Sequence, residues 1–89
     1  MQVKLKILKG SRKDKLLPVQ GTKLLIGRGN ECDLRPRTEL ISRKHCLITM
    51  TDSQVMIRDL GSKNGTFVNG ERIEVEHGLQ NGDRLGIGP

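Results

Sequence analysis

The sequence predicts an all-β fold, either a sandwich or a barrel, and three observations lead to this prediction. Short segments in which apolar and polar residues alternate recur along the chain. Glycine and asparagine, the residues that tight turns favour, separate these segments. No segment places apolar residues at helical spacing over even three turns. Short strands joined by such turns are typical of β-sandwiches and barrels.

Three strands are expected in the first part of the chain. Val3, Leu5 and Ile7 alternate with other residues and indicate a half-buried strand. The expected strands occupy residues 3–8, 16–19 and 23–27, with a charged turn at residues 10–15 between the first two. Residues 28–40 have no periodicity and are expected to form a long loop, with a one-pair strand at Asp33 and Leu34.

The second part of the chain is richer in turn signals. Asn-Gly pairs stand at positions 64–65 and 69–70, and both residues tolerate the positive φ of tight hairpin turns. Strands are expected at residues 45–51 and 54–59, joined as a hairpin, then at 66–68, 71–75 and 84–87. Residues 78–83 are expected to form a loop.

Length and composition indicate one small domain. A chain of 89 residues buries only about 60–65% of its unfolded surface. Because 34% of the residues are hydrophobic and Phe67 is the one aromatic, the core must be built from Leu, Ile and Val, with Phe67 expected in it. The chain has no apolar run of the roughly 20 residues that span a bilayer, and its N-terminus does not resemble a secretory signal.

The two cysteines favour a reducing compartment. Cys46 lies in an apolar strand, where a free thiol packs as a small hydrophobe, so we expect no disulfide with Cys32. We therefore expect a cytoplasmic protein. The spacing of the two Cys and two His matches no zinc module, and no metal or cofactor is expected.

The net charge of +6 indicates attraction to anions without saying which. On charge alone, nucleic acid, a membrane surface and a phosphorylated peptide all stay open.

Three clusters of residues carry the functional signal. They are Gly27-Arg28, then Ser42-Arg43-Lys44-His45, then Ser62-Lys63-Asn64-Gly65-Thr66, followed by a closing segment at residues 82–88. In this order and spacing they resemble the forkhead-associated (FHA) domain, a module that recognises phosphothreonine peptides. The resemblance covers essentially the whole chain. It implies a two-sheet antiparallel β-sandwich of about 10–11 short strands, with the recognition loops at one end.

The resemblance also implies a role for each matching residue. Arg28 corresponds to the phosphate-binding arginine, and a guanidinium offers a planar fork of donors that fits two phosphate oxygens. Ser42 corresponds to the serine whose hydroxyl donates to the phosphate, and Arg43 to a position that often reaches it. Asn64 corresponds to the side chain that holds the main chain of the ligand.

Four further positions need separate interpretations. Lys63 stands where family members carry Thr, and a lysine there could steer acidic ligands. Gly27, His45 and Gly65 are expected to support the site structurally, His45 by bracing the loops through hydrogen bonds. Specificity beside the phosphothreonine is expected from side chains of the recognition loops. The candidates, which the sequence does not rank, are Lys63, Glu39 and Arg35.

Two other classes of function compete with this interpretation. Ser42 and His45 could be taken for a nucleophile and its base, but no orienting acid or oxyanion hole accompanies them, so we expect no enzyme. The main alternative is a small basic β-domain that binds RNA or single-stranded DNA. Such domains stack bases on exposed aromatics, and this chain has neither Tyr nor Trp.

The expected partner is therefore a protein or peptide segment that contains phosphothreonine, with no specific nucleic acid and no membrane. The resemblance further implies one more strand after the segment matching residues 82–88, lying between the first strand and residues 84–87. We expect residues 1–89 to be an FHA-like domain that lacks this strand, and to be monomeric unless the missing strand drives association.

Overall fold

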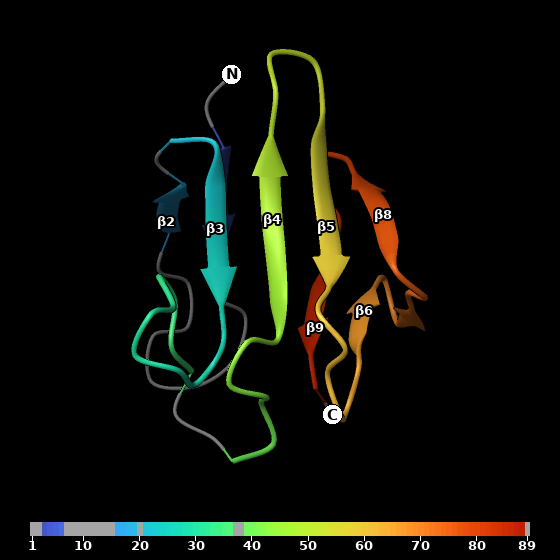
Figure 1. Cartoon of the computed structure of the whole chain (residues 1–89). Helices are drawn as coiled ribbons and strands as arrows, with labels where there is room; N and C mark the ends of the chain where they lie inside the picture. Colours follow the sequence, from blue (N-terminus) through green and yellow to red (C-terminus); the bar gives the residue numbers. More distant parts are fainter. Residues whose placement is uncertain (1–2, 7–15, 20, 37–38, 89) are drawn as a thin grey trace.

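The structure is a computed structural model, and it describes residues 3–6, 16–19, 21–36 and 39–88 (Figure 1). The described residues form strands and loops, with no helix among them and therefore none long and apolar enough to cross a membrane. The nine strands are β1 (Val3–Lys6), β2 (Leu16–Val19), β3 (Lys23–Ile26), β4 (Cys46–Met50), β5 (Val55–Asp59), β6 (Thr66–Val68), β7 (Glu71–Arg72), β8 (Glu76–Leu79) and β9 (Leu85–Ile87). The charged turn expected at residues 10–15 lies outside the described residues.

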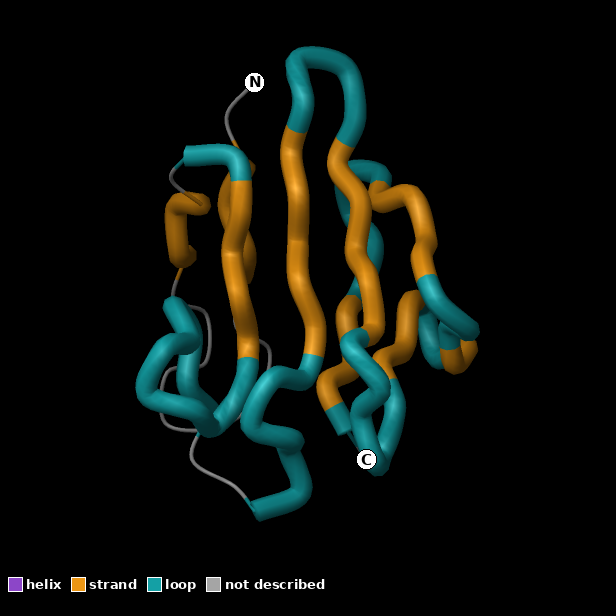
Figure 2. Tube along the Cα trace, viewed as in Figure 1, coloured by secondary structure: helices purple, strands orange, loops and turns teal. Residues whose placement is uncertain are grey.

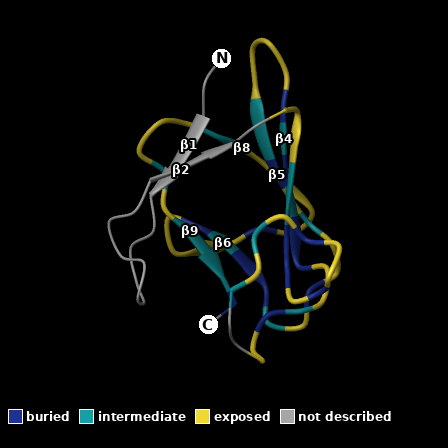
Figure 3. Ribbon diagram, turned by 90° about the vertical axis from the view of Figure 1, so that its left-hand side faces the viewer, coloured by how far each residue is buried: buried dark blue, intermediate teal, exposed yellow. Residues whose placement is uncertain are grey.

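The strands pair into antiparallel sheets that pack face to face. One sheet has the order β3-β4-β5-β8 and another the order β7-β6-β9, while β1 pairs with β2. Figures 1 and 2 show β6 and β9 behind the four-stranded sheet, and Figure 3 shows the two layers from the side. The prediction of an all-β antiparallel sandwich is confirmed, with nine strands described where 10–11 were expected.

The core lies between the two layers and is built from aliphatic side chains. Along β4, Cys46, Ile48 and Met50 are buried while the residues between them are partly exposed, as the period of two in a strand requires. The buried cluster consists of Ile26, Cys46, Ile48, Ile57, Val68 and Ile73. Each fully buried isoleucine contributes about 1.5–3 kcal/mol of hydrophobic stabilisation.

Both cysteines are free and buried. Burial raises the pKa of the Cys46 thiol to about 12, so this group stays protonated and packs as an apolar side chain.

The prediction that Phe67 lies in the core is wrong. Thr66 and Val68 point inward and are buried, so the alternation of the strand turns Phe67 to the opposite face of the sheet, where it is half-buried. There it lies over its cross-strand partner: a Cβ atom added to Gly86 would be 3.1 Å from Cβ of Phe67.

The strand expected at residues 71–75 and the loop expected at 78–83 also need correction. The chain leaves β7 after Arg72, and Glu76–Leu79 forms β8, which pairs with β5 in the other sheet. Residues such as Glu76 and Gly78 have low strand propensity. Their conformation follows from backbone pairing with β5, a contact distant in sequence that local patterns do not reveal.

The predicted turns between neighbouring strands are largely confirmed. β4 and β5 form the expected hairpin. Asn69 and Gly70 adopt φ of 53° and 85° and make the two-residue turn between β6 and β7. The pair at 64–65 differs, because only Gly65 has a positive φ and β5 and β6 belong to different sheets. Asn64 is therefore part of an inter-sheet loop rather than a hairpin turn.

Candidate functional site

The three sequence clusters meet at one end of the sandwich, at the bottom of Figure 1. Gly27-Arg28 follows β3, Ser42 to His45 precedes β4, and Ser62 to Gly65 precedes β6. Backbone hydrogen bonds join the first two clusters directly. The backbone N–H of Arg28 donates to the carbonyl of Ser42 at 3.1 Å, and that of Gly29 to the carbonyl of Arg43 at 2.9 Å.

Gly27 is required at its position by close packing. A Cβ atom there would lie 2.2 Å from the carbonyl oxygen of Arg43, far inside van der Waals contact. The clash would be with backbone, which cannot move aside as a flexible side chain can. Gly27 thus lets the two segments approach closely enough for the hydrogen bonds of Arg28 and Gly29 to form.

The side chain of Arg28 is exposed, and one hydrogen bond from its Nε fixes its position. Its Nε donates to the carbonyl of Ile41, a residue that is itself buried. This contact fixes the orientation of the guanidinium while its two terminal amino groups have no hydrogen bond to a described residue. A guanidinium fixed in this way can present paired donors to an anion.

Ser42 connects the second cluster to the third. Its hydroxyl oxygen accepts a hydrogen bond from the backbone N–H of Lys63 at 3.1 Å. The hydroxyl proton has no acceptor among the described residues and can be donated to a ligand. The side chains of Arg43, Lys44 and Lys63 are exposed around this point.

His45 is fully buried and joins two loops through both ring nitrogens. Nδ1 lies 3.1 Å from the backbone nitrogen of Ser42, whose N–H donates to it. Nε2 lies 2.7 Å from the carbonyl oxygen of Gly65 and must therefore carry the proton. The carbonyl of Gly65 also accepts the backbone N–H of Gly88 at 2.9 Å.

The side chain of Asn64 contacts the segment that precedes the second cluster. Its Nδ2 donates to the carbonyl of Leu40 at 2.8 Å. Its Oδ1 accepts no hydrogen bond from the described part of the chain. The side chain is partly exposed, and Asn64 directly follows Lys63, whose backbone N–H donates to the hydroxyl of Ser42.

The sequence analysis missed Asp59, which organises the loop that carries Lys63 and Asn64. Its carboxylate accepts hydrogen bonds from the hydroxyls of Ser62 at 2.5 Å and Thr66 at 2.8 Å. It also accepts the backbone N–H groups of Gly61 and Ser62, each at 3.1 Å. The hydroxyl of Ser62 in turn accepts the N–H of Gly65.

These contacts lower the pKa of the Asp59 carboxyl group. Partial burial raises its pKa, but the hydrogen bonds from Ser62, Thr66 and Gly61 outweigh that effect and hold the pKa below its usual value. The signal that could have found this role is the spacing, because an Asp two or three residues before Gly-Ser is suited to accept the N–H groups of a turn.

Exposed cationic side chains gather at this end of the sandwich. Arg28, Arg43, Lys44 and Lys63 are all exposed, and none forms an ion pair with a carboxylate among the described residues. Of the other candidates, Arg35 donates to Oδ1 of Asn30 at 3.1 Å and Glu39 is exposed. The exposed cations give the loops a local field that attracts anions.

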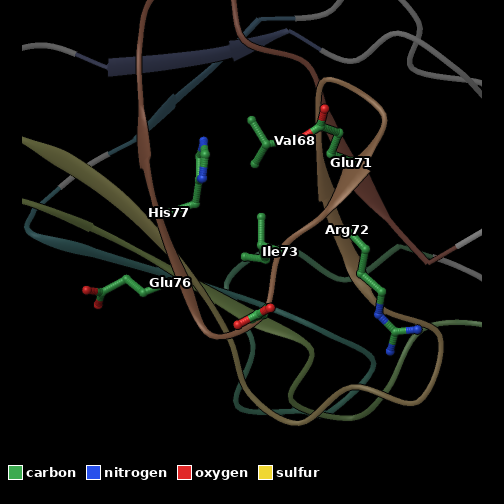
Figure 4. A pocket seen from close by; sticks show the side chains of 7 residues that line it. Val68, Glu71, Arg72, Ile73, Glu76 and His77 are labelled. Carbon is green, nitrogen blue, oxygen red and sulfur yellow. The ribbon is translucent and has the colours of Figure 1, made fainter.

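The described residues offer no cluster of three or more His, Cys, Asp or Glu side chains placed to hold a metal ion. A pocket of about 270 Å³ lies beside β6, β7 and β8 (Figure 4). Its lining residues are Val68, Glu71, Arg72, Ile73, Glu74, Glu76 and His77, so it contains none of the predicted site residues.

Comparison with known proteins agrees with the sequence clusters. The sequence model of the FHA domain family matches residues 24–88. The chain is 34% identical over 70 residues to the human proliferation marker protein Ki-67, covering 79% of this chain and only 2% of that protein.

Two solved structures are also similar. Mycobacterium tuberculosis EmbR in complex with a low-affinity phosphopeptide has a TM-score of 0.80 and 34% identity, covering 83% of this chain and 20% of that one. A structure from a structural and functional analysis of phosphothreonine-dependent FHA domain interactions has a TM-score of 0.87 and 30% identity, covering 99% and 88%.

Proposed function

The chain belongs to the FHA domain family, and we propose from this that it is a non-catalytic module that binds phosphothreonine in a protein or peptide partner of Ser/Thr-kinase signalling. The observation that carries the proposal is the network of hydrogen bonds at one end of the sandwich. It brings Arg28, Ser42 and Asn64, which are far apart in sequence, into a single exposed and positively charged group.

The geometry supports a division of roles among these residues. The terminal amino groups of Arg28 and the hydroxyl of Ser42 would donate to phosphate oxygens, with Arg43 and Lys63 adding charge. Oδ1 of Asn64 would accept a main-chain N–H of the ligand, whose extended backbone needs partners of this kind. Gly27, His45 and Gly65 would keep the loops in this arrangement.

The contacts of His45 support a binding role rather than catalysis. Both ring nitrogens are engaged with backbone groups, Nδ1 with Ser42 and Nε2 with Gly65. Neither nitrogen is therefore available to take a proton from the hydroxyl of Ser42, which a serine nucleophile would require. The two free buried cysteines support a reducing compartment, and we propose a cytoplasmic location for the domain.

The proposal is tested by titrating the chain with one labelled peptide in three forms, containing threonine, phosphothreonine or phosphoserine. Fluorescence anisotropy at physiological salt measures each dissociation constant. We expect binding to require phosphate and to strengthen as the pH rises through about 6, where the phosphate gains its second charge. Burying the extra methyl group of threonine should favour phosphothreonine over phosphoserine by about 0.8 kcal/mol, or roughly fourfold.

Peptide choice is controlled by screening a library with fixed phosphothreonine and random flanking residues before the titration. If no phosphothreonine sequence in that library binds better than its unphosphorylated form, the proposal is wrong. Submicromolar, sequence-selective binding of an oligonucleotide at the same salt would instead favour the nucleic-acid alternative.

A further inference from the structure

The sequence contains three Asn-Gly pairs, at positions 64–65, 69–70 and 81–82, and the structure describes all of them. Asparagine loses its side-chain amide more readily before glycine than before other residues, because glycine has no side chain to keep its backbone nitrogen away from the asparagine. Since the three pairs have the same two residues, large differences in their reactivity must come from the contacts that each pair makes in the fold.

This deamidation needs water and no other reactant. The backbone nitrogen of the glycine attacks Cγ of the asparagine, so a bond from this nitrogen to Cγ forms while the bond from Cγ to Nδ2 breaks. The proton of the glycine N–H is transferred to Nδ2, which leaves as ammonia. Water then opens the five-membered ring at one of its two carbonyl groups and gives aspartate or isoaspartate. The reaction therefore requires that the asparagine side chain and the next backbone nitrogen can turn toward each other.

The pair at 64–65 is held at both reacting groups. Nδ2 of Asn64 donates to the carbonyl of Leu40 at 2.8 Å. Gly65 is buried, its N–H donates to the hydroxyl of Ser62 at 3.1 Å, and its carbonyl oxygen lies 2.7 Å from Nε2 of His45. The attacking nitrogen is thus fixed within the loop, and this pair can react only after these contacts open.

The pair at 69–70 is held through the asparagine. Oδ1 of Asn69 accepts the backbone N–H of Arg84 at 2.9 Å, and Nδ2 donates to Oδ1 of Asp83 at 3.0 Å. The backbone N–H of Asn69 also donates to the carbonyl of Arg84 at 2.8 Å. Both polar atoms of the side-chain amide are engaged, so turning Cγ toward the nitrogen of Gly70 would break two hydrogen bonds.

The pair at 81–82 differs from the other two. Both residues are exposed, and no hydrogen bond joins the Asn81 side chain or the N–H of Gly82 to any residue that the structure describes. A Cβ atom on Gly82 would have no atom within 4 Å. The contacts of this turn come from its outer residues, because the N–H of Asp83 donates to the carbonyl of Gln80 at 3.1 Å and the N–H of Gln80 donates to Oδ2 of Asp83 at 2.8 Å.

We propose that Asn81 is a site of spontaneous deamidation in the folded protein, whereas the fold protects Asn64 and Asn69. Deamidation of Asn81 lowers the net charge of +6 by one unit. The modified turn follows Leu79, which pairs with Val55 at the start of β5, whereas the three sequence clusters lie at the other end of the sheet (Figure 1). The modification therefore leaves the residues of those clusters unchanged.

The two products of the reaction should differ in stability. Aspartate at position 81 keeps the normal backbone of the turn. Isoaspartate adds one atom to the main chain inside the turn that Gln80 and Asp83 close, so it disturbs the two hydrogen bonds between them. We expect the isoaspartate form to melt at a lower temperature than Asn81→Asp, which represents the aspartate product.

The site is tested by incubating the folded chain at 37 °C and pH 8 and measuring deamidation at each pair by peptide mapping with mass spectrometry. The same chain unfolded in guanidinium chloride is the reference, because only the local sequence acts there. Asn81→Gln is the matched control, since a glutamine must close a six-membered ring and reacts far more slowly. Circular dichroism establishes that each variant is folded.

In the unfolded chain we expect the three rates to lie within fivefold of one another. In the folded chain Asn81 should react at least tenfold faster than Asn64 and Asn69, and Asn81→Gln should remove most of the acidic forms that ion exchange separates. Asp83→Ala takes away the acceptor of Nδ2 of Asn69, so it should raise the rate at Asn69 at least threefold while Asn64 stays protected.

Three outcomes would overturn the inference. The folded chain could show no deamidation at Asn81, or it could react at Asn64 or Asn69 as fast as at Asn81. The unfolded chain could already show the ranking of the folded chain, in which case the local sequence and not the fold would explain it. None of these rates involves a ligand, so the proposed function is tested separately.

Discussion

Replacing Asp59 with alanine should destabilise the domain more than the loss of a partly exposed side chain usually does. The carboxylate accepts four hydrogen bonds, and two of the donors are the hydroxyls of Thr66 and Ser62, which are 0% and 8% exposed. A buried donor left without a partner costs about 1–3 kcal/mol, and water can replace the contact to the exposed Gly61. We therefore expect the free energy of unfolding to fall by about 2–4 kcal/mol.

The measurement is urea unfolding followed by far-ultraviolet circular dichroism, because the chain has no Trp or Tyr to report by fluorescence. Asp52→Ala is the matched control. Asp52 is exposed in the turn between β4 and β5, so its loss should change stability by no more than about 0.5 kcal/mol. A loss below about 1 kcal/mol for Asp59→Ala would refute the reasoning.

The same comparison should depend on pH in a defined direction. The folded state lowers the pKa of Asp59, whereas an unfolded chain has an aspartate pKa of about 3.9. The stabilisation linked to ionisation is therefore fully present above about pH 4, and it is lost as the pH falls through the lower folded-state pKa. The stability difference between wild type and Asp59→Ala should shrink on acidification, and an unchanged difference at pH 2.5 would contradict this account.

Gly27 and His45 each give one further prediction. Gly27→Ala should lower both the melting temperature and the phosphopeptide affinity, because its Cβ would lie 2.2 Å from the carbonyl of Arg43; a variant as stable as wild type would show that the loop can rearrange. His45→Ala should lose the two hydrogen bonds that join the loops and cost about 2–4 kcal/mol in urea unfolding, and a loss under about 1 kcal/mol would argue against its bracing role.

The sequence was most informative where a local pattern determines the structure. The alternation along β4 and β5 and the Asn69-Gly70 turn are governed by neighbouring residues, and the hairpin formed as expected. The same logic should have placed Phe67 correctly, since its neighbours Thr66 and Val68 face inward. Phe67 was predicted to lie in the core because it is apolar. The buried residue is instead its polar neighbour Thr66, whose hydroxyl donates a hydrogen bond to Asp59.

Contacts between segments that are distant in sequence could not be predicted from local patterns. β8 forms because Glu76–Leu79 meets β5, and nothing in its composition indicates this. For the site, the residues matching the family motif were identifiable in advance. The contacts of Asp59 with the hydroxyls of Ser62 and Thr66 depend on how the loop folds back on β5, and they appear only in three dimensions.

The central claim is that Arg28 binds the phosphate of a phosphothreonine ligand, and the affinity of Arg28→Ala tests it most directly. Anisotropy titrations with a phosphothreonine peptide should compare wild type, Arg28→Ala and Arg84→Ala, each shown to be folded by circular dichroism. Loss of a charged pair of hydrogen bonds should cost about 2–4 kcal/mol, which weakens binding roughly 30- to 1000-fold, while Arg84→Ala should stay within threefold of wild type. A folded Arg28→Ala variant that binds the phosphothreonine peptide within threefold of wild type would contradict the account.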